Sequence, residues 1–138
     1  RFFEGKNGLL RMQEDFLASG ETLVLGISAM DEVFRVFPQF SESYVPGRVK
    51  RGIRSKLIYT AKDERIIKLM SSNDAMLRES KYISPEKFPI STDITIYKDS
   101  VAIATLKEKL FGAIITNKEV ANSFRGMFNL IWTMANTI

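Results

Sequence analysis

The sequence predicts an α/β domain in which a mixed β-sheet carries packed helices. In the first half, helical segments with one apolar face alternate with short, nearly continuous apolar runs, which are typical of strands buried on both faces. In the second half, alternating segments follow one another, and a long amphipathic helix closes the chain. The length of 138 residues suits one domain of ordinary size, so we expect a single domain over residues 1–138.

The first half predicts βα units. The helices and strands with clear bounds are residues 7–19 (helix), 21–27 (strand), 54–60 (strand) and 62–72 (helix). Between the two strands another helix is expected, with Ser28 as its N-cap because Asp31 follows three residues later. Pro38 and Pro46 are expected to interrupt or kink this helix.

The second half predicts consecutive strands and a closing helix. The strands are residues 77–83, 92–97, 101–106 and 110–115. Asp99 and Ser100 are expected to form the tight turn between the second and third of these strands. Asn117 is expected to cap the final helix, whose apolar stripe packs on the sheet.

The composition excludes several chemistries. Histidine and cysteine are both absent, which removes imidazole bases, thiolate nucleophiles and the commonest zinc ligands. We therefore expect no catalytic residue, no metal, no cofactor and no enzymatic activity. The absence of cysteine fits a reducing compartment, and no apolar run is long enough to span a membrane, so a cytoplasmic location is expected.

The ends of the first two strands predict a ligand site. In open α/β sheets, ligands gather at the carboxyl ends of parallel strands, which here lie near Ser28 and Thr60. Ser28, Thr60 and Lys62 are therefore candidate ligand contacts, with Tyr97 and Arg125 as further candidates. A purely structural role for these residues, as caps of helices and turns, stays open.

A basic segment runs from residue 48 to residue 68. It holds eight basic and two acidic side chains, a net charge of +6 in a chain whose total is +4. Its first four cations are Arg48, Lys50, Arg51 and Arg54. Two interpretations stay open: a patch that binds phosphate groups or nucleic acid, and a solvated helix end whose cations favour the negative terminus of the helix dipole.

The last helix carries more apolar side chains than one sheet face requires. Trp132, Met134 and Ile138 lie outside its main stripe. We expect this surplus to lie at or near a homodimer contact. Coverage of Trp132 by its own sheet is the alternative.

Four stretches together resemble the C-terminal domain of TrmB-like transcriptional regulators. They are residues 3–9 (FEGKNGL), 49–54 (VKRGIR), 94–103 (ITIYKDSVAI), and the ending 120–132, which contains Val120-Ala121, Phe124-Arg125 and Met127-Phe128. The resemblance covers nearly the whole chain, and the ordered set of stretches carries it.

This resemblance implies a phospholipase-D-like fold used as a regulatory or sensor domain. Phospholipase-D-type catalysis needs a His-x-Lys motif, so the fold is expected here without its catalytic motif. The resemblance further implies a small-molecule effector, a sugar being one candidate, and DNA contact through an N-terminal winged helix-turn-helix outside this sequence. Two alternatives stay open: a nucleic-acid-binding module that uses residues 48–68, and a degenerate phospholipase-D or nuclease-like enzyme domain.

Overall fold

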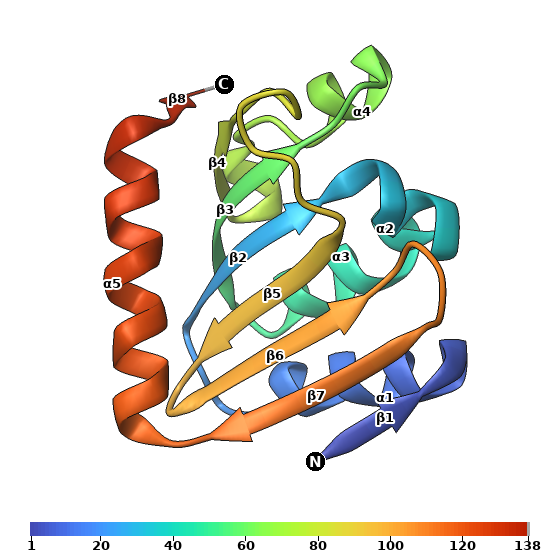
Figure 1. Cartoon of the computed structure of the whole chain (residues 1–138), viewed down its shortest axis with the longest axis vertical. Helices are drawn as coiled ribbons and strands as arrows, with labels where there is room; N and C mark the ends of the chain where they lie inside the picture. The colour runs from blue at the N-terminus through green and yellow to red at the C-terminus, as the bar shows by residue number, and fades with distance from the viewer. Residues whose placement is uncertain (138) are drawn as a thin grey trace.

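The computed structural model describes residues 1–137 and contains one eight-stranded mixed sheet (Figure 1). The strands are β1 (Phe2–Glu4), β2 (Leu23–Ala29), β3 (Arg54–Thr60), β4 (Arg78–Tyr82), β5 (Thr92–Tyr97), β6 (Ser100–Thr105), β7 (Phe111–Thr116) and β8 (Asn136–Thr137). Across the sheet they lie in the order β1-β7-β6-β5-β2-β3-β4-β8. β2, β3 and β4 run parallel, and the other neighbouring strands pair antiparallel. The predicted mixed sheet with packed helices is confirmed.

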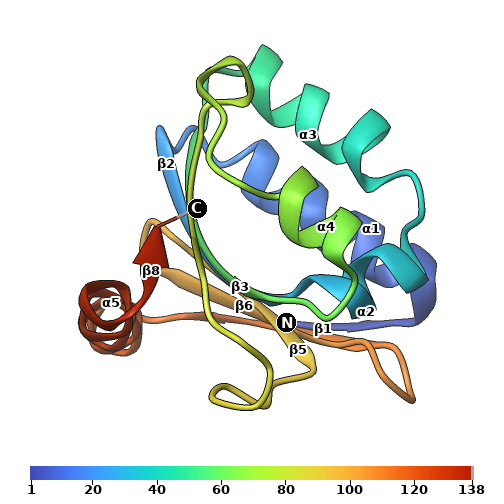
Figure 2. The same ribbon diagram turned by 90° about the horizontal axis from the view of Figure 1, so that it is seen from above.

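Helices cover the two faces of this sheet unequally (Figure 2). They are α1 (Gly5–Leu17), α2 (Met30–Val36), α3 (Phe40–Lys50), α4 (Glu64–Leu69) and α5 (Lys118–Met134), with a 3-10 turn at Asp74–Met76. The first four helices form a layer on one face, and α5 packs on the opposite face. Within residues 1–137, none of these helices has both the length and the hydropathy needed to cross a bilayer.

Strand alternation divides the apolar side chains between two cores. On β2, Val24 belongs to the core under α1 to α4, whereas Leu25 and Ile27 belong to the core under α5. On β3, Tyr59 lies in the first core and Ile58 in the second. Both faces of these central strands are buried, which is why each reads as a nearly continuous apolar run.

Several predicted elements agree closely with the structure. β3 and β5 have the predicted bounds, Arg54–Thr60 and Thr92–Tyr97. Asn117 caps α5 as predicted, because its Oδ1 accepts the backbone N–H of Val120 at 3.0 Å. The short edge strand β1 is not predicted, since three residues are too few to show an alternation, and it is fixed by antiparallel pairing with β7.

Two local predictions are wrong. Ser28 is not an N-cap: it lies inside β2, and α2 begins at Met30 without a side-chain cap. The turn between β5 and β6 consists of Lys98 and Asp99, because Tyr97 pairs with Ser100 across the hairpin. Lys98 adopts a φ of 48°, the left-handed conformation that two-residue hairpin turns require.

Only one of the two prolines separates helices. The chain leaves helical conformation around Pro38, between α2 and α3, as predicted. Pro46 lies inside α3 at an exposed position, and the helix continues past it to Lys50. A proline removes one backbone N–H, and the carbonyl that it leaves unbonded is best tolerated on the side of a helix that faces water.

Candidate functional site

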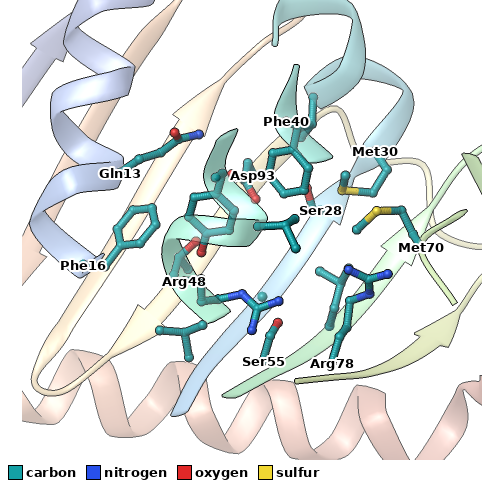
Figure 3. Close-up of a pocket in the computed structure, with 17 residues that line it drawn as sticks. Gln13, Phe16, Ser28, Met30, Phe40, Arg48, Ser55, Met70, Arg78 and Asp93 are labelled. Atoms are coloured by element: carbon teal, nitrogen blue, oxygen red, sulfur yellow. The ribbon is translucent and has the colours of Figure 1, made fainter. Parts of the chain in front are cut away.

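A cavity of about 50 Å³ lies between the helical layer and the sheet (Figure 3). Its walls come from α1, α2 and α3 and from the strands β2 to β5. A space of this size holds a small ion or a few water molecules. Apolar side chains such as Phe16, Met30 and Met70 line much of it. Its polar lining includes Ser28, Arg48, Ser55, Arg78 and Asp93.

Arg48 is a buried side chain in this wall. It projects from the last turn of α3 and is 2% exposed. Its guanidinium donates to the carbonyl oxygens of Ile53 at 2.7 Å, Met76 at 2.7 Å and Leu77 at 3.3 Å. The sequence pattern groups Arg48 with the surface cations of the basic segment. This grouping requires correction, because these contacts turn Arg48 inward between α3 and the start of β4.

Arg78 is the second buried cation, and the sequence does not predict it as a site residue. It begins β4, is 7% exposed, and donates to the carbonyl oxygens of Leu69 at 2.9 Å and Ser71 at 3.2 Å. Among the described side chains, no carboxylate lies within 4.0 Å of either buried arginine. Burial lowers the pKa of both guanidinium groups, and the positive charge of Arg48 lowers the pKa of Arg78 further.

Ser28 and Asp93 form another polar part of the cavity wall. They lie directly opposite each other in the antiparallel pairing of β2 with β5, so their side chains share the face toward the helices. Ser28 is 2% exposed, and its Oγ has no hydrogen-bond partner among the described residues. Burial raises the pKa of the Asp93 carboxyl to about 6, and the Ser28 hydroxyl, at longer than ordinary hydrogen-bond distance, opposes that rise by favouring the charged carboxylate.

The other predicted ligand contacts near the strand ends lie in a different place. Thr60 ends β3 on the face of Ile58, whereas Ser28 projects from the opposite face of the sheet. Thr60 and Lys62 line an open cleft of about 370 Å³, beside the loop that contains Pro85. The structure therefore separates Thr60 and Lys62 from Ser28.

Tyr97 and Arg125 lie away from both the cavity and the cleft. The Tyr97 hydroxyl donates to Asp15 Oδ2 at 2.7 Å, and burial together with this bond raises the pKa of Tyr97. Arg125 projects from α5 and donates to the Asn122 side chain at 3.1 Å and to the carbonyl of Lys98. The five predicted ligand contacts thus do not meet in one cavity, and a ligand-binding role for each stays a prediction.

Exposed cations surround the turn between α3 and β3. Lys50, Arg51 and Arg54 are exposed, as a surface patch requires. Further along β3, Lys56 packs its ammonium 4.5 Å from the Trp132 ring centroid, and Lys81 on β4 packs at 4.7 Å from the same centroid. The surface cations of the basic segment therefore reach an aromatic side chain on α5.

The residues of the predicted dimer contact differ in their surroundings. Trp132 stacks on Phe128 of its own helix, with ring centroids 5.6 Å apart, and packs against the second core. Met134 is 77% exposed. Ile138 lies outside the described residues. Dimerisation through this helix stays a prediction, and of the predicted contact residues Met134 is the one that the structure shows exposed.

Comparisons with known proteins identify the fold. No family model matches the sequence, and no curated protein matches it. Among 14 similar solved chains is TrmBL2, described as an archaeal chromatin protein with a novel mode of DNA binding, at a TM-score of 0.69 and 15% identity. The match covers 100% of this chain and 52% of TrmBL2, so this chain spans about half the length of that protein.

Two further solved structures match over nearly their full length. Nuc from Salmonella typhimurium, a phospholipase D family member, has a TM-score of 0.68 and 18% identity, with 100% of this chain and 96% of Nuc covered. NucT from Helicobacter pylori has a TM-score of 0.69 and 10% identity, with 100% and 98% covered. The expectation that the chain is not an enzyme is contradicted, because its fold is that of a phospholipase D family member. The chain has a phospholipase-D-like fold.

Proposed function

We propose that this chain is the ligand-sensing regulatory domain of a DNA-associated protein, and that the ligand occupies the cavity between the helices and the sheet. The carrying observation is the Ser28 hydroxyl, which is buried in the cavity wall and makes no hydrogen bond of ordinary length to a described residue, although it lies close enough to the Asp93 carboxyl to lower the pKa of that group. Nearly all buried polar groups in proteins have a hydrogen-bond partner, and an exception beside a cavity indicates a partner that binds there. The partly buried carboxyl of Asp93 lies directly across from it.

The link to DNA is supported by the fold shared with TrmBL2, a chromatin protein about twice as long as this chain. In the proposed mechanism, DNA is contacted through another part of a longer protein. The ligand binds one arrangement of a homodimer more tightly than another and thereby shifts the population between them. Such a shift changes the spacing of the DNA-reading parts without a change in the contacts that they make.

Replacement of Ser28 by valine tests the proposal. The added methyl groups fill part of the cavity, and the loss of an unpaired buried hydroxyl costs little stability. Parent and variant are screened by thermal unfolding against a panel that contains glycerol as a small neutral polyol, inorganic sulfate, inorganic phosphate and a sugar phosphate. At least one compound is expected to raise the parent Tm in a saturable way and to lose this effect in S28V.

Ser80 provides the matched control, because its hydroxyl is also buried and unpaired but lies outside the cavity lining. S80A is expected to keep the response of the parent. A panel that leaves the parent Tm unchanged contradicts the sensing function. An equal ligand response in S28V and the parent contradicts the placement of the site.

A second candidate function, nucleic-acid binding by the domain itself, is favoured by the exposed cations. Lys50, Arg51 and Arg54 are exposed, and Lys56 and Lys81 flank an aromatic ring on the adjoining surface. The chain also carries a net charge of +4. Phosphate contacts by such cations are independent of sequence and sensitive to salt.

Filter binding to duplex DNA across a salt series tests this second candidate. The double variant R51Q/R54Q is expected to weaken binding and to reduce the slope of log K against log[salt] by about one for each lost phosphate contact. K107Q, at an exposed cation in the loop between β6 and β7, is the control and is expected to keep the parent slope. Equal slopes for the double variant and the parent contradict direct DNA binding through this patch.

A further inference from the structure

Two positive charges are buried together in the wall of the cavity. Figure 3 shows both guanidinium groups in the wall of the cavity, that of Arg48 beside Ser55 and that of Arg78 toward Met70. The five carbonyl oxygens that accept their hydrogen bonds carry dipoles but no net charge. Buried charges in proteins are normally paired with an opposite charge or held by an ion, because removal from water is costly. Neither arginine has such a partner among the described side chains.

Each of the two arginines has N–H groups that make no hydrogen bond to the described residues. A guanidinium carries more N–H groups than these hydrogen bonds use. Within the described residues, Arg78 Nη1 and Arg48 Nε donate to no acceptor. Two such donors, one from each guanidinium, match the several oxygens of a phosphate, sulfate or carboxylate better than they match a spherical halide.

The cavity has room for a small ion and adjoins a surface groove. Its volume of about 50 Å³ is of the order of one small polyatomic ion. A surface groove of about 360 Å³ lies beside it, between α1 and the start of α3. Gln13, Phe40 and Tyr44 line both the groove and the cavity, so these side chains stand between the buried arginines and the surface.

We propose that Arg48 and Arg78 together hold a small oxyanion of the sulfate or phosphate class, either free or as the charged group of a larger metabolite. This proposal rests on the ligand-sensing function above and names the chemical class of the ligand. The oxyanion lies at the arginine part of the cavity, near the Ser55 side chain. Asp93 provides an acceptor elsewhere in the wall for a hydroxyl or amino group on a larger ligand.

Calorimetric titration with sulfate, at an ionic strength held constant with chloride, tests the proposal. Sulfate keeps the same charge across neutral pH, so its binding reports on the protein alone. The parent is expected to bind one sulfate per chain in a saturable way. R78M is expected to reduce the affinity by about tenfold or more, since each charge-assisted hydrogen bond lost is worth about this factor.

R11M is the matched control, because Arg11 is an exposed cation on α1 that does not line the cavity. It is expected to bind sulfate like the parent. R78M leaves the carbonyl oxygens of Leu69 and Ser71 without this donor, which costs stability, so circular dichroism first checks that the variant folds. If it does not fold, R78K replaces it: this variant keeps the charge but lacks the fork, and weaker sulfate binding by R78K supports the site.

Further titrations distinguish a free ion from the charged group of a metabolite. They also distinguish failure of the oxyanion site from failure of the ligand-sensing function. Tighter binding of a sugar phosphate than of inorganic phosphate, with the same loss in R78M, supports the oxyanion site and assigns it to a metabolite. Tighter binding of inorganic phosphate, with that loss, supports a free ion. Equal sulfate binding by R78M and the parent overturns the oxyanion site. Binding of glycerol in the cavity without any response to the anions also overturns it, but leaves the sensing function in place. No response to either class overturns both.

Discussion

Replacement of Phe128 by alanine is expected to lower the free energy of unfolding by about 3–5 kcal/mol, the usual cost of truncating a buried aromatic side chain. Phe128 is 0% exposed and lies in the core between α5 and the sheet, against residues such as Leu25 and Ile96. Among the described helices, α5 is the one that covers this face, so little else can fill the space that the ring leaves. A total stability of about 5–15 kcal/mol is typical of a domain, so this one change removes much of it.

Urea denaturation followed by circular dichroism measures this effect. Leu130 lies on the same helix but is 64% exposed, and L130A is expected to change the unfolding free energy by less than about 0.5 kcal/mol. The pair separates the loss of core packing from any general effect of alanine on α5. A loss below about 1 kcal/mol in F128A would show that α5 does not close the second core.

Replacement of Asp93 by asparagine is expected to stabilise the protein at neutral and alkaline pH. Burial raises the pKa of this carboxyl to about 6, above the ordinary value of 3.8. The folded state then holds the Asp93 proton more tightly than the unfolded state. The stabilisation that this tighter proton binding gives is complete below about pH 4 and is lost as pH rises through about 6. The full loss is about 3 kcal/mol as an upper bound, and asparagine, which does not ionise, avoids it.

Urea denaturation of parent and D93N at pH 4.5 and pH 8 checks this prediction. The difference in unfolding free energy between the two proteins is expected to be much larger at pH 8. Ser28 from β2 and Tyr44 and Arg48 from α3 line the cavity together with Asp93, and all three stay unchanged in the variant. D74N, at an exposed carboxyl in the 3-10 turn, is expected to show no such widening. A difference that is the same at both pH values contradicts the burial of an ionisable Asp93.

Local patterns in the sequence were sufficient for much of the fold. The apolar run of β3, the alternation in β5 and the cap at Asn117 each depend on a few neighbouring residues, so each is readable without knowledge of the rest of the chain. The same applies to the absence of histidine and cysteine. The ends of elements were less well predicted: Ser28 has the spacing of a helix cap, but pairing with both β3 and β5 keeps it in the strand.

The candidate site was decided by the tertiary structure. Asp93 alternates with Ile94 along β5, and such alternation is typical of a strand with one face in water. Periodicity assigns a side chain to a face of the sheet but does not show what covers that face. Here α1 to α4 cover it, and they partly bury Asp93 beside Ser28.

The burial of Arg48 and Arg78 was also decided by the tertiary structure. Arg48 stands in a run of exposed cations, and Arg78 begins an ordinary short strand. Their positions are set by carbonyl oxygens up to 29 residues away in sequence, which no local pattern contains. The sequence by itself determined a mixed α/β sheet with a net positive charge, whereas long-range packing alone decided which of those charges are buried together and face a cavity.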